Sequence, residues 1–571
     1  MGTMIMASTP SRFPRLLLLG AVCSLALSPL LGASQDLRVA NLFGDHMVLQ
    51  REKPIRIWGW SAPGEEIQVE FAVGTTAERT GTVRATQDGQ WDLTFKALPS
   101  HSFEGRDLVV ESGGSVRRFT DVLVGDVWIC GGQSNMEWTL RSSRDADLEV
   151  ESADMPEVRY LRLPKVAHLE PQEDFPVRTG ENGGPWRRCI PEEAADCTGV
   201  GYYFARRMRR RLDVPIGLID VSWGGTMAQH WVTQDTLRDF PEMQGYFDEF
   251  EARLSAWREG GGEEGAALRY ADDVAAWETA RAAATAAGER EPRRPDKRQY
   301  EDPAAQGQPG GMLNGVIRPI ARARVRGVLF YQGENNSFGE SWKPFHQTFP
   351  AVISDWRALF DEPQLPFGII QIAGWSNRRS MTYDMNHHTN IVRELQHITW
   401  QRTANTGLIV TYDTNSNGSI HPGRKLPVGE RAARWALSEV YGIKRYRSDE
   451  ALEWRGPLYE SMQVEAGKIT IRFVQGTANG LRLDQDEEAG FYVAGADKEF
   501  HHARVRVQGG DSSLVVWSEE VPEPVAARYG WSNLPAGGLM NSRELPAFPF
   551  RTDTWPLTPH QSTGSYQVPV D

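Results

Sequence analysis

The sequence predicts an α/β protein in which a parallel sheet with helices on both faces is flanked by a β-rich unit at each end. In the middle of the chain, short apolar runs alternate with helix-like stretches, as in a sheet wrapped by helices. Toward both ends, apolar residues alternate with period two, which is typical of antiparallel strands. At 571 residues the chain is long enough for several units. We expect a leader at 1–33, an N-terminal β domain at 34–120, a central domain at 121–441 and a C-terminal β-rich domain at 442–571.

The leader has the features of an export signal. Arg12 and Arg15 precede an apolar run at 16–31, and Gly32 and Ala33 supply small residues for cleavage. Polar residues and a proline interrupt this run, which is shorter than the ~20 apolar residues that a membrane span needs. No later stretch is apolar enough to span a bilayer. We therefore expect an exported protein, periplasmic or extracellular, without a membrane span in the mature chain.

Period-two alternation defines the two terminal units. In the first, apolar residues alternate at 67–73 and 91–95, and turn signals such as Pro63-Gly64 separate the runs. In the last, the same pattern returns at 469–473 and at 505–507.

The alternation of apolar runs and helix-like stretches in the middle of the chain is interrupted at about 235–311. Phe247, Phe250, Leu254 and Trp257 follow the spacing of an amphipathic helix, and the Ala-rich stretch 271–287 indicates a second helix. We expect an inserted helical hairpin, either a solvated decoration or a wall of a substrate cleft.

Charge and cysteine content exclude several classes of function. The formal net charge is −13, and removal of the leader, which holds two arginines and no acid, makes it more negative. Such a surface lacks the basic footprint of a nucleic-acid partner. Cys130 lies in an apolar run and is expected to be a buried thiol, while Cys189 and Cys197 are spaced for a local disulfide in an oxidising compartment. No Cys/His spacing resembles a zinc site, and no metal or cofactor is implied.

Ser134 is the candidate nucleophile. An apolar run ends in Gly131-Gly132, and Gln133-Ser134-Asn135 follow. This pattern places the hydroxyl at a tight strand-to-helix turn, where the start of a helix favours a developing anion. The alternative is a serine that only caps a helix.

The block Gly132-Gln133-Ser134-Asn135-Met136 resembles the nucleophile motif of the sialate O-acetylesterase family, which are carbohydrate esterases on the SGNH-hydrolase fold. Further matching motifs follow in order along nearly all of the mature chain: 214–219, 222–226, 331–336, 420–422 with Lys425, 528–529 and 550–553. The resemblance implies an SGNH-like central sheet and a serine esterase.

A serine hydroxyl needs a base, and His421 is our candidate because an imidazole can take the proton and return it to the leaving sugar oxygen. Here the sequence departs from the family, since Gly418 and Ser419 stand where an aspartate usually precedes the histidine. Glu334 is the first candidate for the orienting acid and Asp413 the second. A Ser-His dyad without an acid is the third option.

For the oxyanion, the resemblance implies the backbone amide of Ser134, an amide in Gly224-Gly225, for which we take Gly225, and an asparagine side chain. We favour Asn336, while the SGNH-like spacing points to Asn335. Gln133, Trp223 and Gln332 are expected to contact the substrate, with Trp223 offering a ring that can stack on a sugar.

We therefore expect an exported serine esterase that removes O-acetyl groups from a glycan through an acetyl-enzyme. The family name implies acetylated sialic acid, and plant hemicellulose such as xylan or xyloglucan is the other candidate substrate. The negative charge slightly favours a neutral glycan. The alternative function is a carbohydrate-binding protein on a catalytically inactive esterase scaffold.

Overall fold

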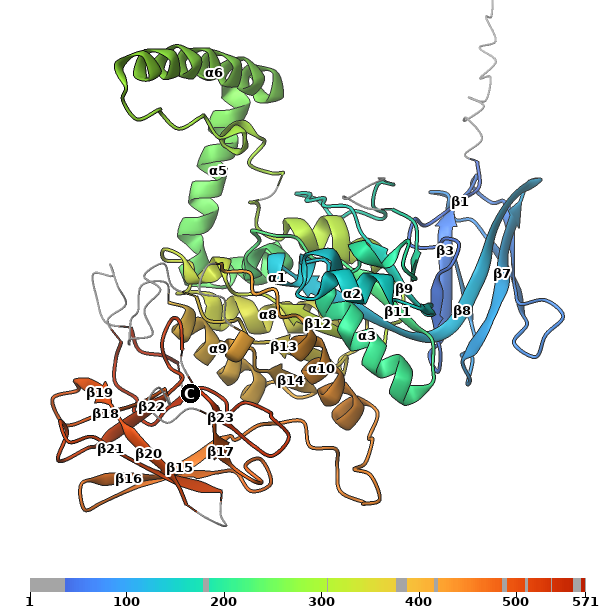
Figure 1. Cartoon of the computed structure of the whole chain (residues 1–571). Helices are drawn as coiled ribbons and strands as arrows, with labels where there is room; N and C mark the ends of the chain where they lie inside the picture. Colours follow the sequence, from blue (N-terminus) through green and yellow to red (C-terminus); the bar gives the residue numbers. More distant parts are fainter. Residues whose placement is uncertain are drawn as a thin grey trace, which may run out of the picture.

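The structure is a computed structural model that describes residues 36–177, 184–305, 307–375, 388–414, 419–484, 490–508, 512–535, 537–557 and 566–569 (Figure 1). The expected leader at 1–33 lies outside the described residues. The α/β architecture expected from the sequence is present, with a central sheet between β-rich regions formed by the two ends of the chain (Figure 1).

The central sheet is parallel except at one edge. Its strands follow the order β10-β9-β11-β8-β12-β13-β14, and only the β10–β9 pair is antiparallel. The strands are β8 (Ser115–Gly132), β9 (Met155–Arg162), β10 (Arg187–Cys189), β11 (Ile216–Asp220), β12 (Gly327–Tyr331), β13 (Phe367–Ile370) and β14 (Thr406–Ile409). After β8 the chain forms β9 and β10 on one side, returns to place β11 between β9 and β8, and then adds β12, β13 and β14 in order on the other side. The carboxyl end of β8 is thus the switch point of the sheet, where open α/β sheets place their sites.

Helices cover both faces of this sheet. On one face α3 (Gly199–Leu212) and α10 (Leu426–Trp435) pack together, and Trp435 lies over Gly368 and Gly407. On the other face Trp356 of α8 (Phe345–Leu359) packs against Phe330. The remaining helices of the central domain are α1 (Ser134–Glu137), α2 (Ala146–Glu151), α4 (Gln234–Arg238), α7 (Arg318–Ile320) and α9 (Thr389–Arg402).

The N-terminal β region is joined to the central sheet by one long strand. β8 pairs with β7 and β2 in its first part and with β11 and β12 in its second. The boundary expected between residues 120 and 121 therefore falls inside a continuous strand. The other strands are β1 (Arg38–Val39), β2 (Val48–Gln50), β3 (Ile55–Trp60), β4 (Glu66–Phe71), β5 (Arg79–Arg84), β6 (Gln90–Phe95) and β7 (Ser102–Ser112).

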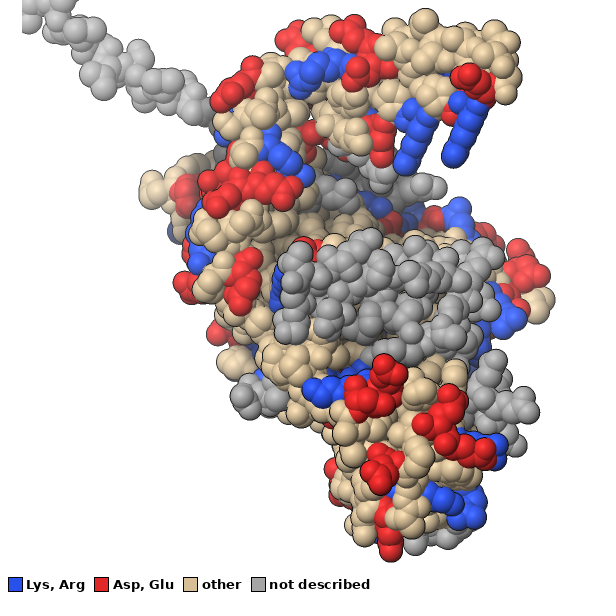
Figure 2. Space-filling view, turned by 90° about the vertical axis from the view of Figure 1, so that its left-hand side faces the viewer, with Lys and Arg blue, Asp and Glu red and all other residues tan. Residues whose placement is uncertain are grey.

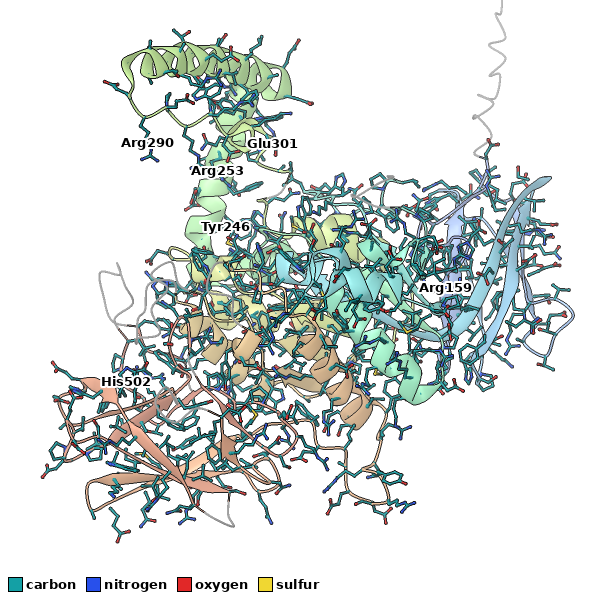
Figure 3. The ribbon with its side chains drawn as sticks, in the orientation of Figure 1. Arg159, Tyr246, Arg253, Arg290, Glu301 and His502 are labelled. Carbon is teal, nitrogen blue, oxygen red and sulfur yellow. The ribbon has the colours of Figure 1, made fainter. Side chains whose placement is uncertain are left out.

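The inserted segment forms an arm that stands away from the body (Figures 1 and 2). α5 (Gln244–Glu259) buries Phe247, Phe250 and Leu254, and α6 (Gly262–Ala287) lies across the far end of α5. The two helices therefore do not pack lengthwise as the expected hairpin. Tyr246 lies at the base of the arm (Figure 3), where its hydroxyl donates to the carbonyl of Gly307 and contacts Nε2 of His230 at 2.8 Å.

The C-terminal β region contains two four-stranded sheets, β15-β16-β21-β20 and β19-β18-β22-β24, and the pair β17-β23. Its strands are β15 (Tyr459–Glu465), β16 (Lys468–Phe473), β17 (Arg482–Leu483), β18 (Phe491–Ala494), β19 (Phe500–His502), β20 (Arg504–Val507), β21 (Ser513–Trp517), β22 (Ala526–Tyr529), β23 (Leu539–Met540) and β24 (Phe550–Arg551). Arg551 forms an ion pair with Glu394 of α9, and the Tyr529 and Tyr412 hydroxyls lie 2.8 Å apart. The late motifs thus dock this region onto the central domain.

The three cysteines beyond the leader are buried and unbridged. Cys130 is the buried thiol expected from its apolar surroundings, and burial raises its pKa well above the ordinary value. The expected Cys189–Cys197 disulfide is absent, because both residues are free thiols in the structure.

Candidate active site

The structure brings Ser134 and His421 together at the switch point. The Ser134 hydroxyl oxygen lies 2.7 Å from Nε2 of His421, although the two residues are 287 positions apart in the chain. Ser134 begins α1 directly after β8, and Gly132 makes the turn with φ of 117°. A Cβ at Gly132 would lie 2.1 Å from the Tyr331 carbonyl oxygen, so only glycine fits this close approach of β8 and β12.

The His421 imidazole is packed on one side by an aromatic ring. Trp138 stacks on it with 5.4 Å between ring centres, and the Trp138 indole nitrogen donates to the Ser142 carbonyl. Burial lowers the pKa of His421 below its ordinary 6.5, the positive charge of Lys425 lowers it further, and Glu137 acts in the opposite direction. The imidazole is therefore neutral near pH 7 and able to accept a proton.

Glu334, the first candidate for the orienting acid, does not contact His421 among the described residues. Its Oε1 accepts a hydrogen bond of 2.5 Å from the Asn135 side-chain nitrogen, and its Oε2 is buried without a partner. The same Asn135 nitrogen donates to the carbonyl of Ile420 at 3.0 Å. Glu334 thus reaches the histidine only through Asn135 and the residue before His421.

A buried lysine completes this network. Lys425 Nζ donates to the Asn135 side-chain oxygen at 2.5 Å, so that Asn135 connects the lysine to Glu334. Burial raises the pKa of Glu334 to about 7 and lowers that of Lys425 to about 7. Opposite charges on the two groups counter both shifts.

Asp413, the second candidate, is occupied elsewhere. Its two carboxylate oxygens accept bonds of 2.7 and 2.6 Å from the Arg431 guanidinium. In the part of the chain that the structure describes, Asp413 therefore makes an ion pair on α10 and no bond to His421.

The two asparagines after Glu334 have different surroundings. Asn336 is fully buried, its amide nitrogen donates to Gln229 and to the Ser341 carbonyl, and its oxygen accepts from the Ala228 amide. Both of its N–H groups are used, so Asn336 has no donor left for an oxyanion, and our preference for it does not fit the structure.

Asn335 lies at the edge of the site instead. Its side-chain nitrogen donates to the Gly225 carbonyl at 2.8 Å. Gly225 is exposed, with φ of 79°, in the loop that follows β11. An amide with a second N–H group beside this exposed loop is better placed than Asn336 to bind a developing anion.

Gln133 and Gln332 connect neighbouring loops by hydrogen bonds and do not lie at the surface. Both are buried, and the Gln332 nitrogen donates to Gln133 Oε1 at 2.7 Å and to the Thr226 carbonyl at 2.8 Å. Gln133 Oε1 also accepts from the Asn335 backbone. These bonds tie together the loops after β8, β11 and β12, so the expected direct contact of Gln332 with substrate is not supported. Trp223 is only partly buried in the same loop cluster.

Sequence reasoning assigned no role to Glu137, although it follows Ser134 by three positions. Its Oε2 accepts a bond of 2.6 Å from the Gly224 amide, and its Oε1 contacts Arg162 and Lys165. Glu137 thereby occupies the Gly224 amide and leaves that of Gly225 as the candidate donor. The sequence feature that could have identified Glu137 is its position on the first helical turn after Ser134, from which its side chain faces the neighbouring loop.

Among the described residues, no three His, Cys, Asp or Glu side chains gather as metal ligands. In the same part of the chain, no helix combines the length and apolarity needed to cross a membrane.

Comparisons with known proteins agree on one family. The family model described as carbohydrate esterase, sialic acid-specific acetylesterase matches residues 124–256 and 311–434. Human sialate O-acetylesterase is 26% identical over 79% of this chain and 79% of its own length, and the mouse protein of that name is 23% identical over 90% and 94%. A solved carbohydrate acetylesterase from Xanthomonas citri is 30% identical, covers 91% of this chain and all of its own, and superposes with a TM-score of 0.71.

Proposed function

The chain belongs to the family of sialic acid-specific carbohydrate acetylesterases and is a carbohydrate O-acetylesterase, and from this premise we propose that Ser134 and His421 carry out the reaction. The observation that carries the proposal is the 2.7 Å contact between the Ser134 hydroxyl and His421 Nε2. The pair lies at the switch point of a sheet whose strand order suits an SGNH-type hydrolase.

In the first half of the reaction, Ser134 Oγ attacks the carbonyl carbon of the acetyl group while His421 Nε2 takes the hydroxyl proton. The tetrahedral intermediate collapses when the bond to the sugar oxygen breaks, and His421 returns the proton to that oxygen. In the second half, His421 takes a proton from water, the hydroxide attacks the acetyl-enzyme, and acetate leaves as Ser134 regains its proton.

The oxyanion of each intermediate is held by the backbone amides of Ser134 and Gly225 and by the Asn335 side chain. The first N–H groups of a helix have no acceptor within the helix, which leaves the Ser134 amide available. Each donor aimed at the developing charge lowers the barrier by about 3 kcal/mol.

Glu334 acts in this proposal as a positioning residue. Asn135 uses one amide group to bond both Glu334 and the Ile420 carbonyl, and it thereby restrains the backbone that carries His421. Trp138 restrains the other side of the ring by stacking. The imidazole is thus held by its neighbours without a carboxylate on Nδ1 among the described residues.

The substrate is an O-acetylated sugar or polysaccharide, with acetylated sialic acid and acetylated hemicellulose as the candidates, and the leader at 1–33 directs the enzyme to the periplasm or the cell exterior. The relatives are named for sialate, which supports the first candidate. The partly buried Trp223 beside the oxyanion loop supports sugar stacking in either case.

The test is acetate release by residues 34–571 and by the Ser134→Ala variant from acetylated sialic acid, xylan and xyloglucan. We expect the parent to release acetate from one of them and Ser134→Ala to lose ~10⁴-fold or more in rate while it keeps its unfolding temperature. Full turnover by a folded Ser134→Ala variant would refute the mechanism. Cleavage of the chain near Ala33 in an exporting host tests the leader.

A further inference from the structure

A large cleft lies between the central domain and the C-terminal β region, and of the residues discussed above Asp413 and Arg431 line it. It has a volume of about 1120 Å³ and is lined by residues of α3, of α10, of the segment after α10 and of the C-terminal region. The segment after α10 is the orange loop that extends below it in Figure 1. Eleven of the lining residues are Arg or Lys and only four are Asp or Glu, although the whole chain has a net charge of −13. The face drawn in Figure 2, by contrast, carries acidic and basic side chains interspersed.

Part of this positive charge is not neutralised within the protein. Arg431 pairs with Asp413, Arg207 with Glu430 and Arg482 with Glu544. Six further cations of the cleft form no ion pair within the described residues. They are Arg210, Arg211, Arg424, Arg434, Lys444 and Arg447, of which Arg424 and Arg434 donate to backbone carbonyls.

The neighbouring positive charges also affect Arg434, which lines the cleft. Burial lowers the pKa of Arg434 and the neighbouring positive charges of Arg543 and Arg207 lower it further, while Glu453 and Glu430 act in the opposite direction. An anion bound here would relieve this repulsion, and arginine forks bind carboxylates in a bidentate way.

Two observations point to a sugar polymer as the anion. Tyr446 lines the cleft and is 84% exposed; the Arg447 guanidinium lies over its ring at 4.9 Å, so the opposite ring face is the one that suits stacking on a sugar. The cleft also adjoins the catalytic loop, because the lining residues Asp413 and Arg424 stand on either side of His421 in the chain, and Arg424 donates to the Asp413 carbonyl.

We propose that this arginine cleft binds a carboxylate-bearing polysaccharide of the uronic acid type and holds the chain on the enzyme while acetyl groups are removed at Ser134. Binding of the polysaccharide is independent of the proposed function, and only the removal of acetyl groups at Ser134 rests on it. It also reverses the slight preference for a neutral glycan that net charge alone gives, since the charge of one cleft differs in sign from that of the whole surface.

The experiment measures binding of the Ser134→Ala form of residues 34–571 to polygalacturonate, to neutral xylan and to single-stranded DNA. Two double variants remove charge from two elements of the cleft: Arg210→Gln with Arg211→Gln on α3, and Lys444→Gln with Arg447→Gln in the segment after α10. The matched control is Arg290→Gln with Arg293→Gln on the exposed arm, where Figure 3 shows Arg290 far from the cleft.

We expect polygalacturonate to bind, each cleft variant to weaken this binding roughly three- to tenfold, and about 0.5 M salt to abolish it, while the arm control leaves it unchanged. Xylan binding should not respond to these changes. The same three double variants are also made in the enzyme that keeps Ser134. Their turnover of para-nitrophenyl acetate should equal that of the parent, because none of the six substituted residues lies in the proposed catalytic machinery.

The outcomes separate the inference from the function. Absence of polygalacturonate binding, or equal losses in cleft and arm variants, overturns the cleft proposal even if Ser134 proves essential. Tighter binding of DNA than of polygalacturonate overturns it in favour of a phosphate polymer.

The chain's own acidic stretch at 484–488 provides the last alternative. If polygalacturonate binds only when Asp486→Asn, Glu487→Gln and Glu488→Gln are combined in one variant, the ligand of the cleft is the chain's own acidic stretch, and the proposal is wrong. Binding by the cleft together with full esterase activity in Ser134→Ala would instead refute the catalytic assignment and leave the cleft intact.

Discussion

The link from Glu334 through Asn135 to the backbone of His421 makes a quantitative prediction for Glu334→Gln. At pH above about 7, where Glu334 is ionised, its carboxylate accepts a buried hydrogen bond of 2.5 Å from Asn135, and such charge-assisted bonds contribute about 1.5–3 kcal/mol against about 1 kcal/mol for a neutral one. The glutamine oxygen still accepts from Asn135, so the variant loses about 1–1.5 kcal/mol of restraint, which corresponds to roughly a tenfold lower kcat. KM should change little, because Glu334 is buried and does not face substrate.

A double-mutant cycle with Asn135→Leu tests the route. If Glu334 acts only through Asn135, Glu334→Gln should change kcat by less than about twofold in the Asn135→Leu background. The assay is acetate release across a range of pH, with the unfolding temperature measured for each variant. Asp413→Asn is the control, and we expect it to lower kcat less than Glu334→Gln because Asp413 bonds Arg431.

An equal tenfold loss in both backgrounds would refute this reasoning, since Glu334 would then act on His421 by a route that does not pass through Asn135. A larger loss for Asp413→Asn than for Glu334→Gln would refute the assignment of Glu334 as well.

Three other properties are predicted from the same contacts. Because the base must be neutral and the pKa of His421 is lowered, activity should rise with pH along an acidic limb whose midpoint lies below 6.5, and a midpoint above that value in the kcat/KM profile would contradict it. Asn335→Ala should lower kcat by about a hundredfold or more through loss of an oxyanion donor, whereas Asn336→Ala should mainly lower the unfolding temperature; the reverse ranking would return the donor role to Asn336. Asp553→Asn should destabilise the protein by about 3 kcal/mol in urea unfolding, because it leaves the buried Arg528 without its carboxylate partner, and an unchanged midpoint would show that the pair contributes little.

Much of the fold could be predicted from local patterns of apolar and polar residues in the sequence. Alternation with period two and apolar runs between helix-like stretches are set by burial of one face or both faces of a sheet, so they identify the β regions and the central sheet. Domain limits are less local, and the boundary expected at residue 120 falls inside β8, because this strand continues from one sheet into the next.

The candidate nucleophile and base were predicted from their motifs, and the structure places Ser134 and His421 in contact. The structure places two of the supporting residues differently from the prediction, because Glu334 bonds Asn135 and not His421, and both N–H groups of Asn336 are used in buried bonds. Asn335 and Asn336 are adjacent, but the turn after Glu334 sends one side chain into buried bonds with Gln229 and the other toward Gly225.

What the sequence by itself determined is the chemistry available: a serine after two glycines at a strand end, a histidine far along the chain, and carboxylates and amides on neighbouring strand ends. Only the tertiary structure decided which of these groups meet. Hydrogen bonds depend on distances of a few tenths of an ångström and on side-chain direction, which are fixed by packing between β8, β12 and the loop of His421. The same holds for the arginine cleft, because its cations come from three separate parts of the chain and form one positive surface only after the C-terminal region has docked.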